Sequence, residues 1–399
     1  MLSVDWTVYL ALLTNGLFPW AVGGMQKHST NLIREWALTG VDLDVYFTQA
    51  PGYPAVEEIQ RALVPAQASG RVRFFASAPS WLPYFPLHHY ADCYVESCRM
   101  AGQWMRESPK TEFIYAQGLT GWKLLRMKRH GVQLPPIGVN LHGMEALQDF
   151  NGGIKERLLK WGGGPIERWL LRHADVALSL GGRLDETIRS VAPQAAILHS
   201  GNGIQHEWLC DHVEAHNSPR KFVFVGRYSH RKGLHVLYEA IQRLSSDLKC
   251  EFHLVGDIPE ANQCKDGRLT YHGPIVNEMA MKSLLRQMDV LVCPSLAEGV
   301  PTVVLEGMAS GLAIIATDVG ATSLLVDSDN GYLIKAGDAT ALRAALANAA
   351  VMATGALLQL RAKGLEKARN HAWPHVAMET LKEIETFVGI GLVARAASN

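Results

Sequence analysis

Short apolar segments alternate with longer helical stretches along most of this chain, and this alternation limits the folds open to it. In the first half, strand candidates are TVYLALL (7–13), DVYF (44–47), VRFF (72–75), EFIYA (112–116), IGVNL (137–141), DVALSL (175–180) and AAILH (195–199). Helix candidates between them include 25–39, 88–107 and 152–172. Strands that alternate with helices predict an open parallel sheet covered by helices.

The pattern breaks at residues 200–220, which are rich in Gly and Asn, and then restarts. Strand candidates at 221–226, 250–256, 269–273, 289–295 and 313–317 alternate with helix candidates at 232–246, 277–287 and 301–310. The chain is therefore predicted to form two Rossmann-like α/β domains that face each other across a cleft. Open α/β sheets bind ligands at the carboxyl ends of their strands, so we expect the site in that cleft.

Length and composition support a two-domain globular protein. The 399 residues exceed what one core usually holds. Lys+Arg and Asp+Glu are both 38, so the net charge gives no reason to expect a nucleic-acid partner. The six cysteines include no CxxC pair and are predicted to be reduced, as in the cytoplasm. The opening MLSVDW lacks Lys and Arg, which favours a first strand over a signal peptide.

The segment EGVPTVVLEGMASG (298–311) places Glu298 and Glu306 around a predicted helix, with Pro301 at its first position and Gly311 just past its end. The N–H groups that open a helix can bind an anion. Carboxylates repel phosphate and suit neutral hydroxyls instead. A nucleotide-sugar, with a diphosphate between two polyols, meets both requirements. Two glutamates that merely favour the helix dipole explain this segment alone equally well.

Two cations strengthen the nucleotide-sugar interpretation. In VFVGRYSHRKGLHVL, Arg227 and Lys232 follow a predicted strand that ends at Gly226. Cations in this position can neutralise a diphosphate. An isolated pair would more often be a solvated basic loop, but a parallel sheet brings this loop to the same edge as Glu298 and Glu306.

Two weaker candidates lie in the first half. Gly23 and Gly24 follow the first predicted strand, where missing side chains let a phosphate approach the backbone. A lone Gly-Gly pair is more often an ordinary turn. His142 follows the strand candidate 137–141 and precedes a glycine; a lone histidine is more often structural than catalytic.

Taken together, these motifs resemble a known family. GRYSHRKG, CPSLAEGVPTVVLEGMASGLAIIATDVG and NGYLI resemble the C-terminal domain of the group-one family (family four) of retaining glycosyltransferases with the GT-B fold. GGMQKHS and LHG resemble its N-terminal motifs, and HAWPHVAMETLKEI resembles its last helix, which crosses back to the first domain. The resemblance is strong from about 221 to 335 and weak across 50–135.

The resemblance implies a role for each matching residue. Arg227 and Lys232 would bind the donor diphosphate, Glu298 the transferred sugar and Glu306 the ribose. The implied catalytic set is His142, Glu298, Arg227 and Lys232. The implied donor-binding set is Gly23, Gly24, Gly226, Arg227, Lys232, Gly256, Pro274, Ile275, Glu298, Gly299, Val300, Thr302, Val303 and Glu306. Gly307 departs from the family pattern, in which Ala is commoner.

We expect no metal and no cofactor beyond the nucleotide-sugar. DLD at 42–44 resembles the metal-binding DxD of the other glycosyltransferase fold, but it is predicted to form a turn before a strand, whereas a metal motif should follow one. The basic stretch WKLLRMKRHG (122–131) fits an anionic membrane or a lipid-linked acceptor, although helix faces packed on the sheet explain it better. We predict a cytoplasmic protein, with peripheral attachment at the inner face of the membrane as an open alternative.

The sequence thus predicts a retaining, metal-independent hexosyltransferase of polysaccharide biosynthesis. Its donor would be a nucleoside-diphosphate sugar, with UDP favoured, and its acceptor a hydroxyl of a glycan, a lipid-linked saccharide or a small molecule. A nucleotide-sugar epimerase of the same fold is the alternative. The expected parts are an acceptor domain (1–200), a donor domain (201–372) and a C-terminal part (373–399). This last part would be a helix that crosses back to the first domain, followed after residue 388 by a loose tail.

Overall fold

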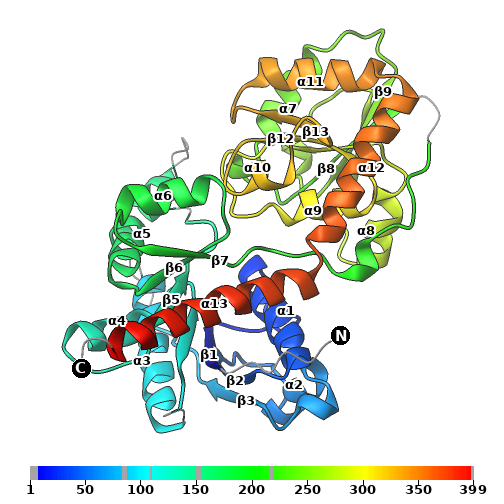
Figure 1. The fold of residues 1–399 in the computed structure, drawn as a ribbon. Coiled ribbons are helices and arrows are strands. Elements are labelled where there is room, and N and C mark those ends of the chain that lie inside the picture. The colour runs from blue at the N-terminus through cyan, green and yellow to red at the C-terminus, as the bar shows by residue number, and fades with distance from the viewer. Residues whose placement is uncertain are drawn as a thin grey trace. The chain divides into compact units, whose positions relative to one another are not determined.

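The computed structural model describes residues 8–82, 88–107, 110–144, 146–148, 154–215 and 219–396. The chain forms two compact units, each with its own parallel sheet (Figure 1). The first unit comprises Met1–Leu147, Glu156–Gly201 and Trp373–Asn399, and the second comprises Gln148–Lys155 and Asn202–Ala372.

The first unit contains a seven-stranded sheet in the order β3-β2-β1-β4-β5-β6-β7, with all neighbouring strands parallel. Every apolar segment predicted as a strand in the first half lies in this sheet. The strands are β1 (Tyr9–Thr14), β2 (Asp42–Thr48), β3 (Val72–Ser77), β4 (Phe113–Gln117), β5 (Ile137–Asn140), β6 (Val176–Ser179) and β7 (Ala196–His199).

Helices cover both faces of this sheet. Buried residues of α1 (Gly24–Thr39), α2 (Val56–Leu63) and α13 (Trp373–Ala396) form one core with the strands. Buried residues of α3 (His88–Glu107), α4 (Trp122–Arg129) and α5 (Ile154–His173) form a second core. The remaining helix is α6 (Arg183–Val191). Apolar strands buried on both faces account for the continuous hydrophobic runs in the sequence.

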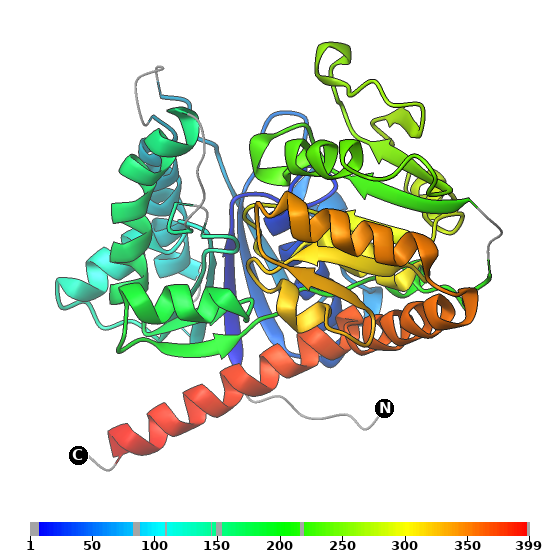
Figure 2. The same ribbon diagram turned by 90° about the horizontal axis from the view of Figure 1, so that it is seen from above.

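The C-terminal helix α13 belongs to the first unit. It packs against α1 and β7, and the indole Nε1 of Trp36 donates a hydrogen bond of 3.0 Å to the carbonyl of Ala377. The prediction of a loose tail after residue 388 is wrong as far as Ala396, since α13 continues to that residue as one helix (Figure 2). GIGLVARA carries enough helix-forming and apolar residues to extend the helix without a break.

The DLD segment is also not the predicted turn, because β2 begins at Asp42. Asp44 is fully buried, and its two carboxylate oxygens accept hydrogen bonds of 2.8 and 2.7 Å from Arg73 of the neighbouring strand β3. This pairing satisfies a buried charge inside a strand. The Asp44 carboxylate therefore has a structural role in joining the two strands.

The second unit contains a six-stranded parallel sheet in the order β10-β9-β8-β11-β12-β13. Its strands are β8 (Arg220–Val225), β9 (Cys250–Val255), β10 (Leu269–Gly273), β11 (Val290–Cys293), β12 (Ala313–Thr317) and β13 (Gly331–Ile334). Five of these were predicted, and β13 was recognised only as the motif NGYLI. The two sheets confirm the predicted class of two Rossmann-like parallel-sheet domains.

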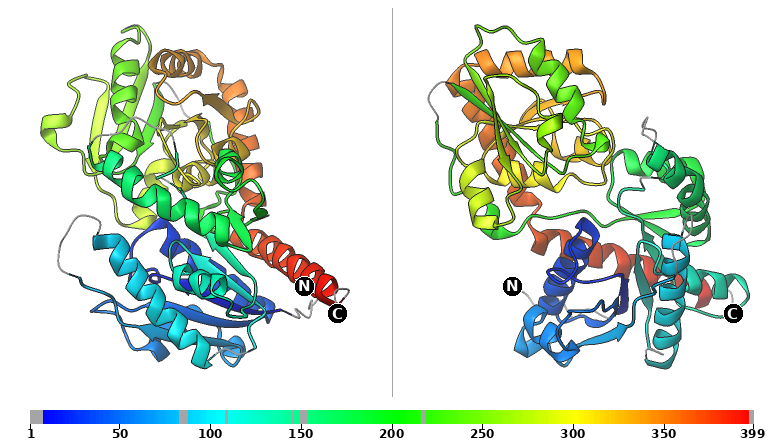
Figure 3. Two further views of the ribbon diagram at one scale, coloured as in Figure 1. Left: turned by 90° about the vertical axis from the view of Figure 1, so that its left-hand side faces the viewer. Right: turned by 180° about the vertical axis from the view of Figure 1, so that it is seen from behind.

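Helices also cover both faces of the second sheet (Figure 3). One core contains residues of α7 (Leu234–Gln242) and α11 (Ala339–Val351), and the other contains residues of α8 (Glu278–Leu285) and α9 (Thr302–Ala309). The remaining helices are α10 (Thr322–Leu325) and α12 (Thr354–Asn370), and α12 packs on α9. Helix α9, which carries Glu306, is thus held between the sheet and α12.

Among the residues that the structure describes, no helix taken alone is both long and apolar enough to cross a membrane. Helices α11 and α12, which meet at an angle of 116°, pass that test on length and composition when they are taken together.

A buried arginine fastens α12 to the C-terminal end of α9. Arg361 is 2% exposed, and its Nε donates a hydrogen bond to the carbonyl of Gly311, two residues beyond the end of α9. Its Nη1 donates to the carbonyl of Glu214 at 2.9 Å and to Oδ1 of Asp289 at 3.3 Å. Asp289 in turn accepts from the backbone N–H of Lys221 at 2.9 Å. This network links α9, α12 and the starts of β8 and β11.

We expect Arg361→Ala to lower the free energy of unfolding of the second unit by about 3 kcal/mol, because it leaves the Asp289 carboxylate buried without its closest side-chain cation. Lys363→Ala, on an exposed face of the same helix, is the matched control and should leave the unfolding midpoint unchanged. Urea denaturation of the full chain measures both. Equal midpoints for the two variants would contradict this role for Arg361.

Candidate functional site

Glu298 lies in a cluster of polar side chains at the carboxyl edge of the second sheet. It is 5% exposed and follows β11. Its Oε1 accepts hydrogen bonds from Lys232 Nζ at 2.6 Å and from the Ser295 hydroxyl at 2.7 Å. Arg231 Nη1 lies 3.8 Å from the other oxygen. The loop after β8 supplies both cations, so the two loops predicted to share an edge of the sheet do meet.

The structure adds Arg231 and Ser295 to the residues predicted at this edge. Arg231 and Lys232 form the end of a short 3₁₀ turn, η3 (His230–Lys232), and the carbonyl of Arg231 accepts a hydrogen bond of 2.7 Å from the N–H of Leu296. Sequence reasoning had a signal for Arg231, namely its place beside Lys232 in SHRKG. It had none for Ser295, because a serine after a strand is too common to single out.

Two glycines allow the loops of this cluster to approach one another. Gly233 has a φ of 67°, and a Cβ on it would lie 1.9 Å from the carbonyl oxygen of Pro294. Gly320 has a φ of 55°, and a Cβ there would lie 2.3 Å from the carbonyl oxygens of both Glu298 and Gly299. Both the left-handed conformation and the lack of space exclude larger residues at these positions. Neither glycine was predicted to belong to the site.

Helix α9 begins beside the cluster. Pro301 is its N-cap and Thr302 its first residue, so the predicted start was one residue early. The opening N–H groups of a helix have no carbonyl in the preceding turn, which leaves those of Thr302 and Val303 oriented out of the helix start. Gly299 and Val300 lie in the loop just before it, and Glu306 is half-buried within the helix. Gly311, with a φ of 78°, ends the helix as predicted.

Gly307, where the resembled family more often has Ala, has a local explanation. A Cβ on Gly307 would lie 2.9 Å from Cδ2 of Leu291 on β11. The leucine side chain occupies the space that an alanine methyl would need, so the two residues compensate for each other.

The remaining predicted donor residues of this unit follow three neighbouring strands. Gly226 follows β8, Gly256 follows β9, and Pro274 and Ile275 follow β10. The Gly226 N–H donates to the carbonyl of Val255 at 3.0 Å, which keeps the first two strand ends together. Arg227 is exposed, in contrast to Lys232. Arg227 therefore lies at the predicted edge but outside the buried cluster.

In the first unit, Gly23 is the N-cap of α1 and Gly24 its first residue. A Cβ on Gly24 meets no heavy atom of the described residues within 4 Å. The packing around Gly24 thus accommodates a side chain, and the fold by itself does not require glycine there. The position is open enough for a ligand group to approach the backbone.

His142 follows β5 in a turn with a φ of 54°, an unusual conformation for a residue other than glycine. Its backbone N–H donates a hydrogen bond of 2.8 Å to Asn140 Oδ1, and its Nε2 lies 2.6 Å from Gln117 Oε1. Burial, together with the neighbouring His28 ring, holds the pKa of His142 well below its usual value. His142 is therefore neutral at physiological pH. Sequence reasoning missed Gln117 and His28.

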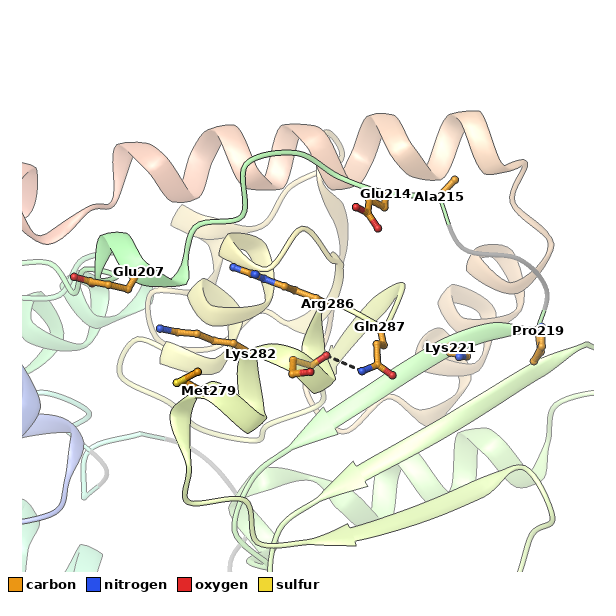
Figure 4. Close-up of a pocket in the computed structure, with 10 residues that line it drawn as sticks. Glu207, Glu214, Ala215, Pro219, Lys221, Met279, Lys282, Arg286 and Gln287 are labelled. Carbon is orange, nitrogen blue, oxygen red and sulfur yellow. Dashed lines mark hydrogen bonds between the residues drawn. The ribbon is translucent and has the colours of Figure 1, made fainter.

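A pocket with a volume of about 960 Å³ lies in the second unit, and Figure 4 shows the residues that line it. It is lined by α8, by the residues around Glu207 and Glu214, and by Lys221 near the start of β8. The start of β8 is the amino end of a parallel strand, so this pocket lies at the sheet edge opposite Glu298. None of the residues predicted for the site lines it.

Comparisons with known proteins agree with this geometry. Residues 219–350 match the family described as Glycosyl transferases group 1. The chain is 38% identical over 127 residues to a putative teichuronic acid biosynthesis glycosyltransferase, TuaC, of Bacillus subtilis, covering 32% of each protein. It is 32% identical over 188 residues to a phosphatidyl-myo-inositol mannosyltransferase of Mycolicibacterium smegmatis, covering 43% of this chain and 47% of the relative. In both cases the matched part is less than half of the relative.

Solved structures match over nearly the whole chain. A sucrose-phosphate synthase from Thermosynechococcus elongatus has a TM-score of 0.73 at 17% identity, covering 96% of this chain and 100% of that one. Anabaena Alr3699/HepE in complex with UDP-glucose has a TM-score of 0.61 at 15% identity, covering 94% and 99%. The whole chain therefore has the GT-B fold of two Rossmann-like domains, and its second unit carries the sequence signature of group 1 glycosyltransferases.

Proposed function

We propose that this protein is a glycosyltransferase that moves a hexose from a nucleoside-diphosphate sugar to an acceptor hydroxyl with retention of configuration. The observation that carries this proposal is the cluster of Glu298, Lys232 and Arg231 beside the start of α9. It combines a buried hydrogen-bond acceptor, two cations and a helix N-terminus at the carboxyl edge of a parallel sheet, where such folds bind ligands.

The cluster suits both halves of the donor. Lys232, Arg231 and the start of α9 would attract the diphosphate and stabilise the negative charge that develops as it leaves. Glu298 would accept hydrogen bonds from sugar hydroxyls. Glu306, which lies about one turn into α9, would contact the ribose. The ammonium of Lys232 has three N–H donors, so it can bond Glu298 and a phosphate oxygen together. The carboxylate thereby holds the cation where the phosphate would bind.

Several finer assignments rest on resemblance and belong to the same proposal. We favour UDP as the nucleotide, a view supported by the neighbour whose structure holds UDP-glucose. Relatives named for teichuronic acid biosynthesis and for a mannosyl transfer to phosphatidyl-myo-inositol support a glycan or lipid-linked acceptor. Transfer would need no metal, because the cations of the β8 loop supply the positive charge. We propose a cytoplasmic enzyme, with peripheral contact at the inner face of the membrane as the alternative. Leu124 and Leu125 of 122–131 are buried in the core of the first unit, which favours packing on the sheet for this stretch.

The comparisons favour a transferase over the epimerase of the same fold. The relatives given above are named as a glycosyltransferase and a mannosyltransferase, which supports transfer of a sugar to an acceptor.

We expect Glu298→Gln to lower kcat/KM for sugar transfer by about 100-fold, since it removes the charge that positions Lys232 and weakens the bonds to the sugar. The amide retains the shape and can still accept from Ser295, so folding should be preserved. Glu278→Gln, on an exposed face of α8, is the matched control and should stay within about twofold of wild type. Rates are measured with the donor identified below.

Lys232→Ala should lose most transfer activity and also lower the melting temperature, because Glu298 stays buried after its closest cation is removed. A thermal-unfolding curve separates the two effects. Transfer rates near wild type in both Glu298→Gln and Lys232→Ala would refute the proposed site.

A screen of UDP-, GDP- and ADP-sugars by thermal shift and donor hydrolysis tests the donor. We expect a UDP-sugar to raise the melting temperature most, and EDTA to leave both readings unchanged because the protein supplies the cations. If epimerised donor forms in the absence of an acceptor, the alternative reaction is correct. If no nucleotide-sugar raises the melting temperature, the proposed function fails.

A further inference from the structure

A continuous chain of hydrogen bonds leads from the backbone of Gly201 to His142. His28 Nε2 lies 3.1 Å from the carbonyl oxygen of Gly201. His28 Nδ1 lies 3.0 Å from Gln117 Nε2, and Gln117 Oε1 lies 2.6 Å from His142 Nε2. Gln117 and His28 are 0% and 1% exposed, so they are shielded from solvent. Three side chains from α1, the end of β4 and the turn after β5 are thus connected in series.

The carbonyl group of Gly201 determines the direction of every hydrogen bond in this series. A carbonyl oxygen only accepts, so His28 carries its proton on Nε2 and presents a bare Nδ1. The Gln117 amide group must then donate to Nδ1, which leaves its oxygen to accept. His142 must therefore carry its proton on Nε2. The remaining ring nitrogen of His142, Nδ1, has a lone pair and acts as an acceptor.

A second set of buried hydrogen bonds fixes the backbone of His142. Asn140 accepts from the His142 N–H and donates from Nδ2 to the Tyr115 hydroxyl at 2.9 Å. The Tyr115 hydroxyl lies 2.6 Å from the Ser200 hydroxyl. Either hydroxyl can donate in this last hydrogen bond, because the Tyr115 oxygen can accept from both Asn140 and Ser200. These bonds maintain the turn in which His142 has its positive φ.

Among the described residues, the groups recorded in contact with the two histidine rings are neutral. The ring centroids of His28 and His142 are 4.9 Å apart in an edge-to-face arrangement, and the indole of Trp373, the first residue of α13, lies edge-on to His28 at 5.4 Å. The groups that act on the His28 ring are the backbone at Ser200 and Gly201, and burial lowers its pKa to about 4. Gln117, Asn140 and Trp373 carry no charge. Neither ring takes up a proton at physiological pH.

We propose that Gln117 and His28 are positioning residues that hold His142 as the neutral Nε2–H tautomer, so that its Nδ1 accepts a hydrogen bond from a hydroxyl of the bound sugar. The role of His142 towards a sugar rests on the function proposed above. The contribution of Gln117 and His28 is new: Gln117 lies outside the motifs that carry the family resemblance, and His28, although it lies within GGMQKHS, was given no role by it. Trp373, the first residue of α13, also contacts the His28 ring.

The tautomer is tested directly by NMR on the full chain labelled with ¹⁵N at histidine. In the wild type, the two-bond ¹⁵N–¹H pattern of His142 and of His28 should show the Nε2–H form, unchanged from about pH 8 down to about pH 5.5. Gln117→Met retains the length of the side chain and removes both hydrogen bonds. In that variant His142 should show a mixture of tautomers. An Nδ1–H form of His142 in the wild type would overturn the proposal.

Kinetic measurements provide a second readout, which would not change if Gln117 had only a structural role. Gln117→Met should lower kcat about tenfold while the KM for the donor changes little. Gln117→Glu still accepts from His142 Nε2–H, so it should recover activity relative to Gln117→Met near pH 8. Its carboxylate raises the pKa of both rings, and a new loss of rate should therefore appear as the pH falls through the raised values. Thr111→Val removes a different buried hydrogen bond of the same unit and is the control.

The outcomes separate this proposal from the proposed function. If Gln117→Met keeps a single Nε2–H tautomer at His142 and a kcat near wild type, Gln117 is not a positioning residue, whatever the donor. If Gln117→Met fails to fold, the spectra of Gln117→Glu provide the test. They should show His142 still protonated on Nε2 and His28 charged; an Nδ1–H form of His142 in this variant would contradict the proposal. If no nucleotide-sugar binds, the proposed function fails, while the tautomer measurement still reports on the hydrogen-bond chain.

Discussion

The hydrogen-bonded ion pair between Glu298 and Lys232 is the interaction on which the candidate site depends. It joins the loop after β8 to the loop after β11, two strands that are neighbours in the sheet but far apart in sequence. A buried carboxylate needs both a cation and further hydrogen bonds, and Lys232 and Ser295 supply them. The charge that would attract a diphosphate is therefore already held in place by the carboxylate that would bind the sugar.

The surrounding backbone is adapted to this pair. Gly233 and Gly320 let the loops come within reach of each other, and α9 begins immediately after the Glu298 loop. Arg361 fixes the other end of α9 through Gly311, so both ends of the helix are anchored. In the first unit, buried neutral hydrogen bonds around His142 have a comparable function. There the fold controls the position of a proton, whereas in the second unit it controls the position of a charge.

The sequence predicted the strands of both sheets well because buried parallel strands are short, apolar and separated by helices. The misses have specific causes. DLD was placed in the turn after the first helix, whereas β2 already begins at Asp42. Asp is disfavoured in strands, and the pairing of Asp44 with Arg73 makes it acceptable there. The helix α13 was ended too early because Gly389 and Gly391 favour a break, although packing on α1 supports the helix before them. Strand β13 begins with Gly331, a residue type that is depleted in strands, and was recognised only as the motif NGYLI.

By itself the sequence determined the fold class, the order of the strands along the chain and the residues that reach the carboxyl edges of the sheets. These follow from local periodicity and from the motifs around Arg227, Lys232, Glu298 and Glu306. Only the tertiary structure decided which of them interact: Lys232 and Arg231 meet Glu298, while Arg227 remains exposed. It also decided that His28 and Gln117 reach His142, because hydrogen bonds between residues distant in sequence depend on strand order, which no local pattern encodes.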